Sequence, residues 1–199
     1  VGSTVTVVFA GATYSTTATD GTWTIIAGTT TPASGTLSVT ANGTNSISVT
    51  AKDAANNTSV AATQTLTIDT TAPSVAVSTD KSAGSYTVGE AINITLTFSE
   101  DVTLAGSAGL DVTLSTGDKI NITAAELNGV STVTKEYTVS ANDNTGALVV
   151  TGIALGTSAT LTDGVGNAAG LTPTANITTA IVIDTNSPGA VAITSSAAD

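Results

Sequence analysis

The sequence from Ala91 to Phe98 is AINITLTF, and its alternation decides the fold class. A large apolar residue stands at every second position from Ile92 onward, with Asn or Thr between them. Successive side chains of a β-strand point to opposite faces, so one face of this segment is apolar and the other is polar. Such a strand packs one face on a core and leaves the other in water, as in antiparallel sheets.

The same two-residue period recurs along the chain, at Val5, Val7 and Phe9; Ile47, Val49 and Ala51; Leu66 and Ile68; Leu110, Val112 and Leu114; and Ile181 and Ile183. Turn-forming residues separate these runs at Gly11, Asp20-Gly21, Asn42-Gly43, Asn128-Gly129 and Asp163-Gly164. No segment carries a convincing 3.6-residue period. Many short, regularly spaced strands predict an all-β fold, either a sandwich or a barrel.

The charge balance excludes several classes of partner. The 199 residues include 15 acidic and 4 basic residues and no His, for a formal net charge of −11. Nucleic acids and anionic membrane surfaces need clustered Lys and Arg, so we expect neither as a partner. No apolar run approaches the roughly 18 residues of a membrane-spanning helix, so we also expect no direct membrane insertion. Excess carboxylate favours a hard cation such as calcium, although acidity that only keeps the protein soluble is an alternative.

The residues that the chain lacks argue against catalysis. It contains no Cys and no His, which excludes a disulfide scaffold, a thiolate zinc site and most nucleophile–base pairs. Glu100-Asp101 and Glu126 lack the aromatic cleft of a sugar hydrolase, and we expect no enzyme activity. Trp23, the sole Trp, is interpreted as a packing residue rather than a sugar platform. The chain also lacks Met, which indicates a processed product or an excerpt.

An internal echo predicts where one domain ends and the next begins. Ile68-Asp69-Thr70-Thr71-Ala72-Pro73 recurs as Ile183-Asp184-Thr185-Asn186-Ser187-Pro188. A second echo precedes each of these segments, since Asp53-Ala54-Ala55-Asn56-Asn57 matches Asp163-Gly164-Val165-Gly166-Asn167. Proline cannot continue a hydrogen-bonded ladder, so each Ile-Asp-Thr…Pro segment predicts a short, stiff linker. The two domains are therefore predicted at residues 1–69 and 73–184.

These motifs resemble the bacterial immunoglobulin-like (Ig-like) tandem repeats of giant secreted surface adhesins. The segments that carry the resemblance are VTAKDAANNTS and LTIDTTAPS in the first domain, and YTVGEAINITLTFSEDV, DGVGNAA and IDT in the second. The resemblance implies tandem Ig-like β-sandwich domains at the cell surface, with a spacer or stalk role and calcium between domains. The chain departs from the repeat pattern at Asn56-Asn57, where Gly-Asn is usual, and at Asn186-Ser187, where Thr-Ala is usual.

The ends of the chain are predicted to complement each other. In repeats of this kind, residues from Val1 onward usually form the second strand, so the domain at 1–69 is expected to lack its first strand. Residues 188–199 alternate at Val191 and Ile193 and are predicted to be the first strand of a following or neighbouring Ig-like domain. Either the chain is one period of a longer array, or it is a discrete subunit whose tail strand completes the next subunit.

Two metal sites are predicted at the junctions between domains. In Ig topology, loop 163–167 should lie beside linker 69–73, together with the expected turn at 98–101. The predicted calcium ligands there are Asp69, Glu100, Asp101, Asp163 and the carbonyl oxygen of Asn167. At the other junction, Asp184 would meet Asp53 and Asn57 of the following copy. The alternative is that these Asp and Asn residues only form turns.

The sequence therefore predicts a structural, extracellular spacer repeat of a cell-surface adhesin, made rigid by calcium between its domains. Its partners would be neighbouring Ig-like repeats or identical subunits, and other domains of the full protein would contact a host or abiotic surface. The alternative is a subunit of an extracellular filament or surface layer that assembles by β-strand donation.

Overall fold

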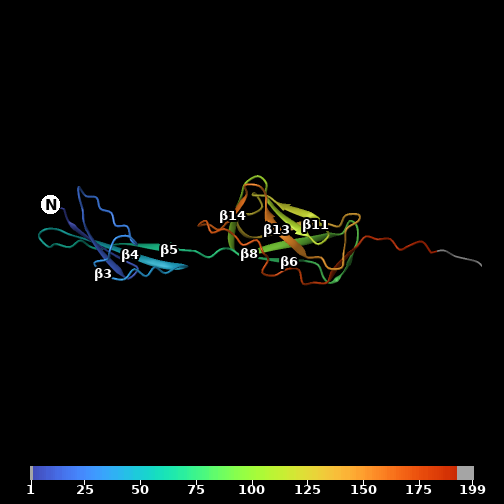
Figure 1. Cartoon of the computed structure of the whole chain (residues 1–199), viewed down its shortest axis with the longest axis horizontal. Coiled ribbons are helices and arrows are strands. Elements are labelled where there is room, and N and C mark those ends of the chain that lie inside the picture. The colour runs from blue at the N-terminus through green and yellow to red at the C-terminus, as the bar shows by residue number, and fades with distance from the viewer. Residues whose placement is uncertain (1, 192–199) are drawn as a thin grey trace, which may run out of the picture. The chain divides into compact units, whose positions relative to one another are not determined.

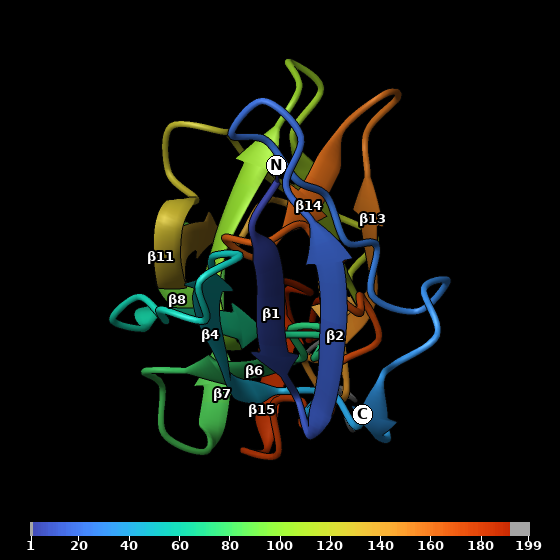
Figure 2. The ribbon, with the colours of Figure 1, turned by 90° about the vertical axis from the view of Figure 1, so that its left-hand side faces the viewer.

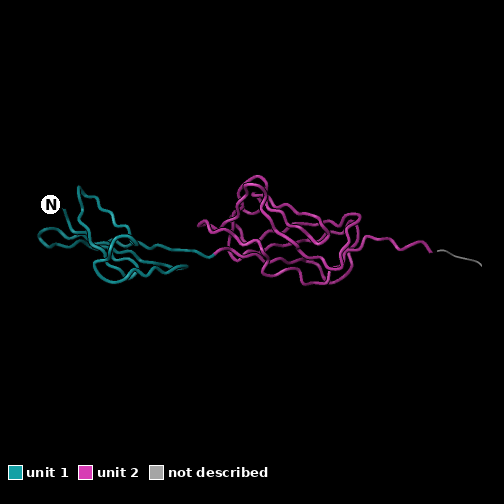
Figure 3. Tube along the Cα trace, viewed as in Figure 1, with its two compact units in different colours: residues 1–71 teal, residues 72–199 magenta. Residues whose placement is uncertain are grey.

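The structure, a computed structural model, describes residues 2–191 and divides the chain into two compact units, residues 1–71 and 72–199. Figure 3 colours them separately. All regular secondary structure in the described residues is β (Figure 1), which confirms the all-β prediction. The described residues also include no helix long and apolar enough to cross a membrane.

The first unit is a single five-stranded sheet. Its strands are β1 (Thr4–Phe9), β2 (Ala12–Thr17), β3 (Ser34–Gly35), β4 (Gly43–Lys52) and β5 (Ala62–Ile68). They are ordered β3-β2-β1-β4-β5, and every pairing is antiparallel. Figure 2 shows β1 and β2 side by side, joined by a two-residue turn at Ala10 and Gly11 with φ angles of 46° and 83°. Positive φ at both positions matches the twist of the strands, which is why Gly stands there.

The core of the first unit is small. Its buried hydrophobic residues are Val5, Val7, Ala12 and Tyr14, all on the inner face of β1 and β2. The segment between β2 and β4 covers part of this face but contains only the two-residue strand β3. Apolar residues on the same face of the other strands stay partly open, and Leu66 on β5 is 42% exposed.

The second unit is larger, and its described residues form ten strands. They are β6 (Val75–Thr79), β7 (Gly84–Tyr86), β8 (Ala91–Ala105), β9 (Leu110–Leu114), β10 (Lys119–Ile122), β11 (Asn128–Thr138), β12 (Asn144–Thr145), β13 (Val150–Leu155), β14 (Thr160–Thr162) and β15 (Ile181–Asp184). One sheet has the order β11-β8-β14 with β6 also on β8, a second has the order β10-β9-β13, and a third has the order β12-β15-β7. The pairing of β7 with β15 is parallel, and the other ladders are antiparallel.

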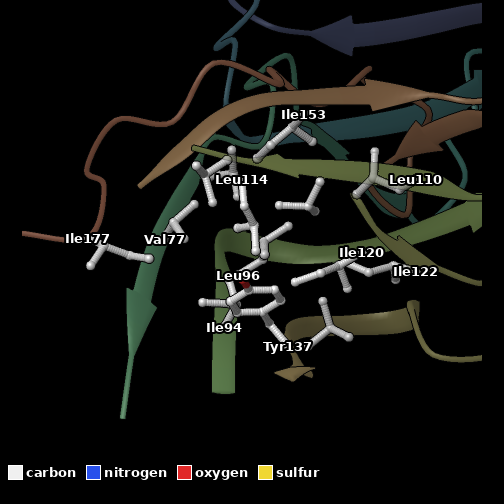
Figure 4. Close-up of a cluster of buried hydrophobic side chains, with 14 of the residues drawn as sticks. Val77, Ile94, Leu96, Leu110, Leu114, Ile120, Ile122, Tyr137, Ile153 and Ile177 are labelled. Carbon is white, nitrogen blue, oxygen red and sulfur yellow. The ribbon is translucent and has the colours of Figure 1, made fainter. Parts of the chain in front are cut away.

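All three sheets of the second unit bury one face in a common core. The alternation at 92–98 becomes a row of side chains on β8 that are at most 3% exposed. Figure 4 shows Leu96 on β8 together with Leu114 on β9 and Tyr137 on β11, pointing into the same interior. This two-faced packing is consistent with a β-sandwich, and the core is built almost entirely from Val, Ile and Leu.

Two predicted turns are wrong, for a shared reason. Residues 98–101 do not form a turn, because β8 continues through them and pairs with β11 on both sides of a register shift. Asn128 and Gly129 lie inside β11, where Gly129 has a φ of 66° at a second irregularity. A β-bulge uses left-handed glycine and extra polar residues just as a turn does, so the local sequence does not separate the two.

The predicted tail strand falls mostly outside the described residues. The strand predicted at 188–199 includes residues 192–199, which lie outside the described residues, and residues 188–191 are exposed without regular secondary structure. The boundary between the units falls between Thr71 and Ala72, within the predicted linker. The Ig-like character of each domain and the missing first strand stay predictions.

Truncation of one core residue of β9 should destabilise the second unit selectively. Leu110 is fully buried, and Leu110→Ala should lower the free energy of unfolding by about 2–5 kcal/mol through lost burial and a cavity. Val88→Ala, at a position 51% exposed, should change it by less than about 0.5 kcal/mol. Denaturant unfolding of both variants measures the difference, and equal effects would contradict this core assignment.

Candidate functional site

Asp163 organises the loop that the sequence singled out in the second unit. Its Oδ1 accepts hydrogen bonds from the backbone N–H groups of Val165, Gly166 and Asn167, at 2.9, 2.7 and 2.8 Å. Its Oδ2 accepts a bond from Asn167 Nδ2 at 2.7 Å, and the Asp163 N–H donates to the Asn167 carbonyl at 3.1 Å. The Asp163 side chain is buried, and burial alone would raise its pKa. The bonds from Asn167, Val165 and Gly166 outweigh this and lower the pKa below its usual 3.8.

The first unit contains the same loop at 53–57. Asn57 donates its backbone N–H to Asp53 Oδ1 and its side-chain Nδ2 to Asp53 Oδ2, both at 2.9 Å. The Asp53 N–H returns a bond to the Asn57 carbonyl at 3.0 Å. The side-chain and backbone bonds from Asn57 lower the pKa of Asp53. The sequence echo is therefore also an echo in hydrogen bonding.

The departure from the repeat pattern at Asn56 has a backbone explanation. Asn56 has a φ of 73° and occupies the place of Gly166, which has a φ of 101°. Asparagine tolerates the left-handed region better than most residues with a Cβ. The loop therefore keeps its shape without glycine.

The structure brings part of the first predicted metal site together within the second unit. Glu100 on β8 and Asp163 place carboxylate oxygens within 4.8 Å of each other, with Asn167 bonded to Asp163. Asp101, the next residue along β8, is exposed. Asp69 belongs to the first unit, and its participation in this site stays a prediction.

Two other predicted ligands, Asp69 and Asp184, each form a turn at the end of a strand. Asp69 follows β5, and its Oδ1 accepts the N–H of Thr71 at 2.9 Å. Asp184 ends β15, and its Oδ1 accepts the N–H of Asn186 at 2.9 Å. Both are Asx turns in which a side chain bonds the backbone two residues on. The last strand of each unit therefore leads into its linker through the same turn.

Sequence reasoning missed two asparagines that hold these linker turns. Asn42 Oδ1 accepts the N–H of Thr70 at 2.6 Å and its hydroxyl at 2.9 Å. Asn144 Oδ1 accepts the N–H of Thr185 at 3.1 Å and the Nδ2 of Asn186 at 2.9 Å. In each unit an asparagine from a distant part of the sequence thus fixes the residue after the linker Asp. Neither asparagine belongs to a local motif shared by the two units, so only the tertiary structure identifies the pair.

The hydrogen bonds of the carboxylate oxygens indicate which of them could bind a cation. Asp163 Oδ1 already accepts three N–H groups, whereas Oδ2 accepts one, so Oδ2 is the Asp163 oxygen with more capacity for a cation, and the Glu100 carboxylate lies close to Asp163. Calcium takes six to eight oxygen ligands, and these two carboxylates supply only a part of such a shell. The residues fit the chemistry of calcium, and a complete site would need oxygens from elsewhere.

Comparisons with known proteins identify no family for the chain. The sequence matches no protein-family profile, and no curated protein is significantly similar to it. A solved structure concerned with the host cell surface retention of a 1.5-MDa bacterial ice-binding adhesin aligns with 93% of this chain, at 21% identity and a TM-score of 0.44. The alignment covers 54% of that chain, so this chain spans about half of its length.

The Asp163 loop should make the stability of the second unit depend on acid pH. A lowered folded-state pKa means that the carboxylate stabilises the fold above the unfolded pKa of about 3.8, and that this contribution is lost as the pH falls through the folded value. Asp163→Asn should therefore be less stable than the parent chain at pH 7, and this difference in stability should become smaller below about pH 4. Melting curves of both chains between pH 2 and pH 7 measure the difference, with Glu136→Gln as a control outside the loop. A gap that is constant with pH would show that the charge of Asp163 is irrelevant.

Removal of an anchoring asparagine should loosen one linker turn without unfolding its unit. Asn144→Ala deletes the acceptor for the N–H of Thr185, so hydrogen exchange at Thr185 should speed up by about tenfold. Exchange at Leu96 in the core of the same unit should not change. Asn42→Ala should have the same effect at Thr70. Unchanged exchange at both threonines would mean that the asparagines do not hold the linkers.

Proposed function

We propose that this chain is a structural segment of an extracellular surface adhesin, with tandem Ig-like units acting as a spacer. The observation that carries the proposal is the repetition of one linker design. Each unit closes a loop with an Asp–Asn pair, ends its last strand at Ile-Asp-Thr, and bonds that threonine to an asparagine. Such repetition is typical of arrays in which each unit touches only its neighbours.

The Ig-like assignment is supported by the architecture of the second unit. Antiparallel sheets pack their inner faces together over one aliphatic core, as expected of a sandwich of about 100 residues. The sequence motifs that resemble adhesin repeats lie on the elements that form this core and on the loop at 163–167. The extracellular, cell-surface location follows from the same resemblance, with neighbouring repeats as the direct partners.

The spacer proposal includes calcium at the joint between the two units. Glu100, Asp101, Asp163 and Asn167 would supply oxygens from the second unit, and Asp69 would add a carboxylate from the linker. The closeness of Glu100 and Asp163 supports this, because two carboxylates within 4.8 Å repel each other and a bound cation would offset that repulsion. Calcium there would restrict bending at the linker and stabilise the folded units by linkage.

A second calcium joint would form between consecutive copies. Asp184 would meet Asp53 and Asn57 of the following copy in the same way that Asp69 would meet the loop at 163–167. The matching hydrogen bonds of the two loops support this equivalence. The second joint would contain fewer carboxylates than the first, so we expect it to bind calcium more weakly.

Calcium should raise the melting temperature of the chain, and chelator should reverse the rise. At a calcium concentration about 100 times the dissociation constant, linkage predicts a stabilisation of about 2.7 kcal/mol. The double variant Glu100→Gln, Asp163→Asn should lose most of this calcium-dependent shift. Thermal unfolding of the whole chain with calcium, with magnesium and with chelator is the measurement.

The matched control for this experiment is Glu136→Gln, which removes one carboxylate from β11 and should keep the calcium response of the parent chain. A melting temperature that is the same with calcium and with chelator would refute calcium at both joints. The spacer proposal itself is tested separately by imaging the native assembly, which should show rods of tandem units.

A further inference from the structure

Asn42 and Gly43 lie in the turn that leads into β4 of the first unit. Asn42 is exposed and has a φ of 54°, and Gly43 is the first residue of the strand. The backbone nitrogen of a residue can attack the side-chain amide of an asparagine directly before it, and glycine allows this most readily because it has no Cβ to hinder the approach. The turn therefore places a nucleophile next to an electrophile.

The linker directs two hydrogen-bond donors at the carbonyl oxygen of this amide. Thr70 donates its backbone N–H to Asn42 Oδ1 at 2.6 Å and its hydroxyl to the same oxygen at 2.9 Å. Attack on Asn42 Cγ would place negative charge on Oδ1. Donors that are already aimed at an oxygen on which charge develops stabilise the transition state, as in an oxyanion hole. The contact that anchors the linker is thus also one that activates the amide.

The nitrogen that would leave and the water that would follow both have room. Within the described residues, Asn42 Nδ2 makes no hydrogen bond. A hollow of about 250 Å³ lies beside it, lined by Asn42, Gly43, Thr67, Ile68 and Asp69. This space admits water to the amide from the solvent side.

The corresponding anchor of the second unit is protected. Asn144 Oδ1 also accepts the N–H of its linker threonine, Thr185. Its Nδ2, however, donates to the carbonyl of Asn142 at 3.0 Å and to Thr185 Oγ1 at 3.4 Å. The next residue is Thr145, whose branched Cβ hinders attack by its own backbone nitrogen. The same anchoring role therefore occurs without the same reactivity.

The second Asn-Gly pair of the chain, Asn128-Gly129, is also held differently. Asn128 lies inside β11 and pairs with Thr103 of β8. The N–H of Gly129, which would be the nucleophile, donates to Thr103 Oγ1 at 3.2 Å. Attack there would break a ladder in the larger unit, whereas attack at Gly43 needs only a turn to open.

We propose that Asn42 is a site of spontaneous deamidation in the folded chain, and that the reaction alters the anchor of the linker after β5. The backbone nitrogen of Gly43 bonds to Asn42 Cγ, the bond from Cγ to Nδ2 breaks, and ammonia leaves with the proton that the Gly43 nitrogen loses. Water then opens the cyclic imide to aspartate or isoaspartate. The inference depends neither on the proposed spacer role nor on calcium.

Both products change the contact with the linker. Isoaspartate routes the backbone through the former side chain, so it displaces the oxygen that accepted the N–H and hydroxyl of Thr70. Aspartate keeps an acceptor there but adds a negative charge to the hollow that Asp69 lines, and like charges repel. Either product makes the formal net charge of the chain more negative than its present −11.

Peptide mapping by mass spectrometry measures the reaction at each asparagine of the whole chain during incubation at neutral pH. In the folded chain, Asn42 should deamidate at least about tenfold faster than Asn128 or Asn144. In concentrated urea, Asn42 and Asn128 should react at similar rates, because both are then unstructured Asn-Gly pairs. Equal rates at Asn42 and Asn128 in the folded chain would overturn the proposal.

Substitutions on the linker test the role of its donors. Thr70→Val keeps the backbone N–H and the side-chain shape but removes the hydroxyl, so it should slow deamidation of Asn42 about fivefold. Thr67→Val is the matched control, since Thr67 lines the same hollow without bonding Asn42, and it should leave the rate unchanged. An unchanged or faster rate in Thr70→Val would show that the hydroxyl does not stabilise the transition state.

Hydrogen exchange connects the modification to the linker. In the isoaspartate fraction, separated by chromatography from aged protein, exchange at Thr70 should be about tenfold faster than in fresh protein, and exchange at Thr185 should be the same. Protein with Gly43→Ala, aged in parallel, should keep the exchange of its fresh form because its asparagine reacts slowly. Identical exchange at Thr70 in modified and fresh chains would show that the reaction does not reach the linker.

Discussion

Burial of one face of β8 is the constraint on which the second unit depends. Ile92, Ile94, Leu96 and Phe98 leave almost no surface in water, and strands from all three sheets supply the residues that cover them. Aromatic residues make up only 3% of the chain, so this core gains its stability from many aliphatic contacts rather than from a few large side chains. The strand therefore has to stay in register over its whole length, and the extra residues at 98–101 are absorbed as a bulge instead of ending it.

The first unit also buries one face of its sheet, but with fewer hydrophobic residues than the second unit. Its inner face is equally apolar in sequence, but only four hydrophobic residues are buried, and an apolar groove on this face stays open. The contrast between Leu66 and Ile181, which correspond in sequence, shows that exposure here reflects a missing neighbour and not a different kind of strand. An uncovered apolar face and an uncharged strand edge are features at which a further strand can add.

Asparagine and aspartate side chains hold loops and linker turns outside the cores through hydrogen bonds. The loops at 53–57 and 163–167 are closed by Asp–Asn pairs, and both linkers begin with an Asx turn held by a distant asparagine. These bonds use carboxylates that were predicted as calcium ligands, so loop formation and the proposed cation binding would use the same side chains. Asp163 could close its loop and also bind a cation, because Oδ1 accepts backbone N–H groups while Oδ2 accepts a single hydrogen bond. The calcium proposal therefore concerns Asp163 Oδ2, with the loop already formed.

The sequence by itself determined the all-β class, the strands with alternating residues, the repeated linker and the paired loops, because side-chain period and local hydrogen bonding are encoded within a few residues. It did not distinguish the bulges at 98–101 and at Gly129 from turns, since both use the same local residues. Only the tertiary structure decided that Asn42 and Asn144 anchor the linkers and that Leu66 lines an open groove on the first unit. Each of these depends on which strands become neighbours, and that choice is made by the burial of whole sheet faces and not by any single segment.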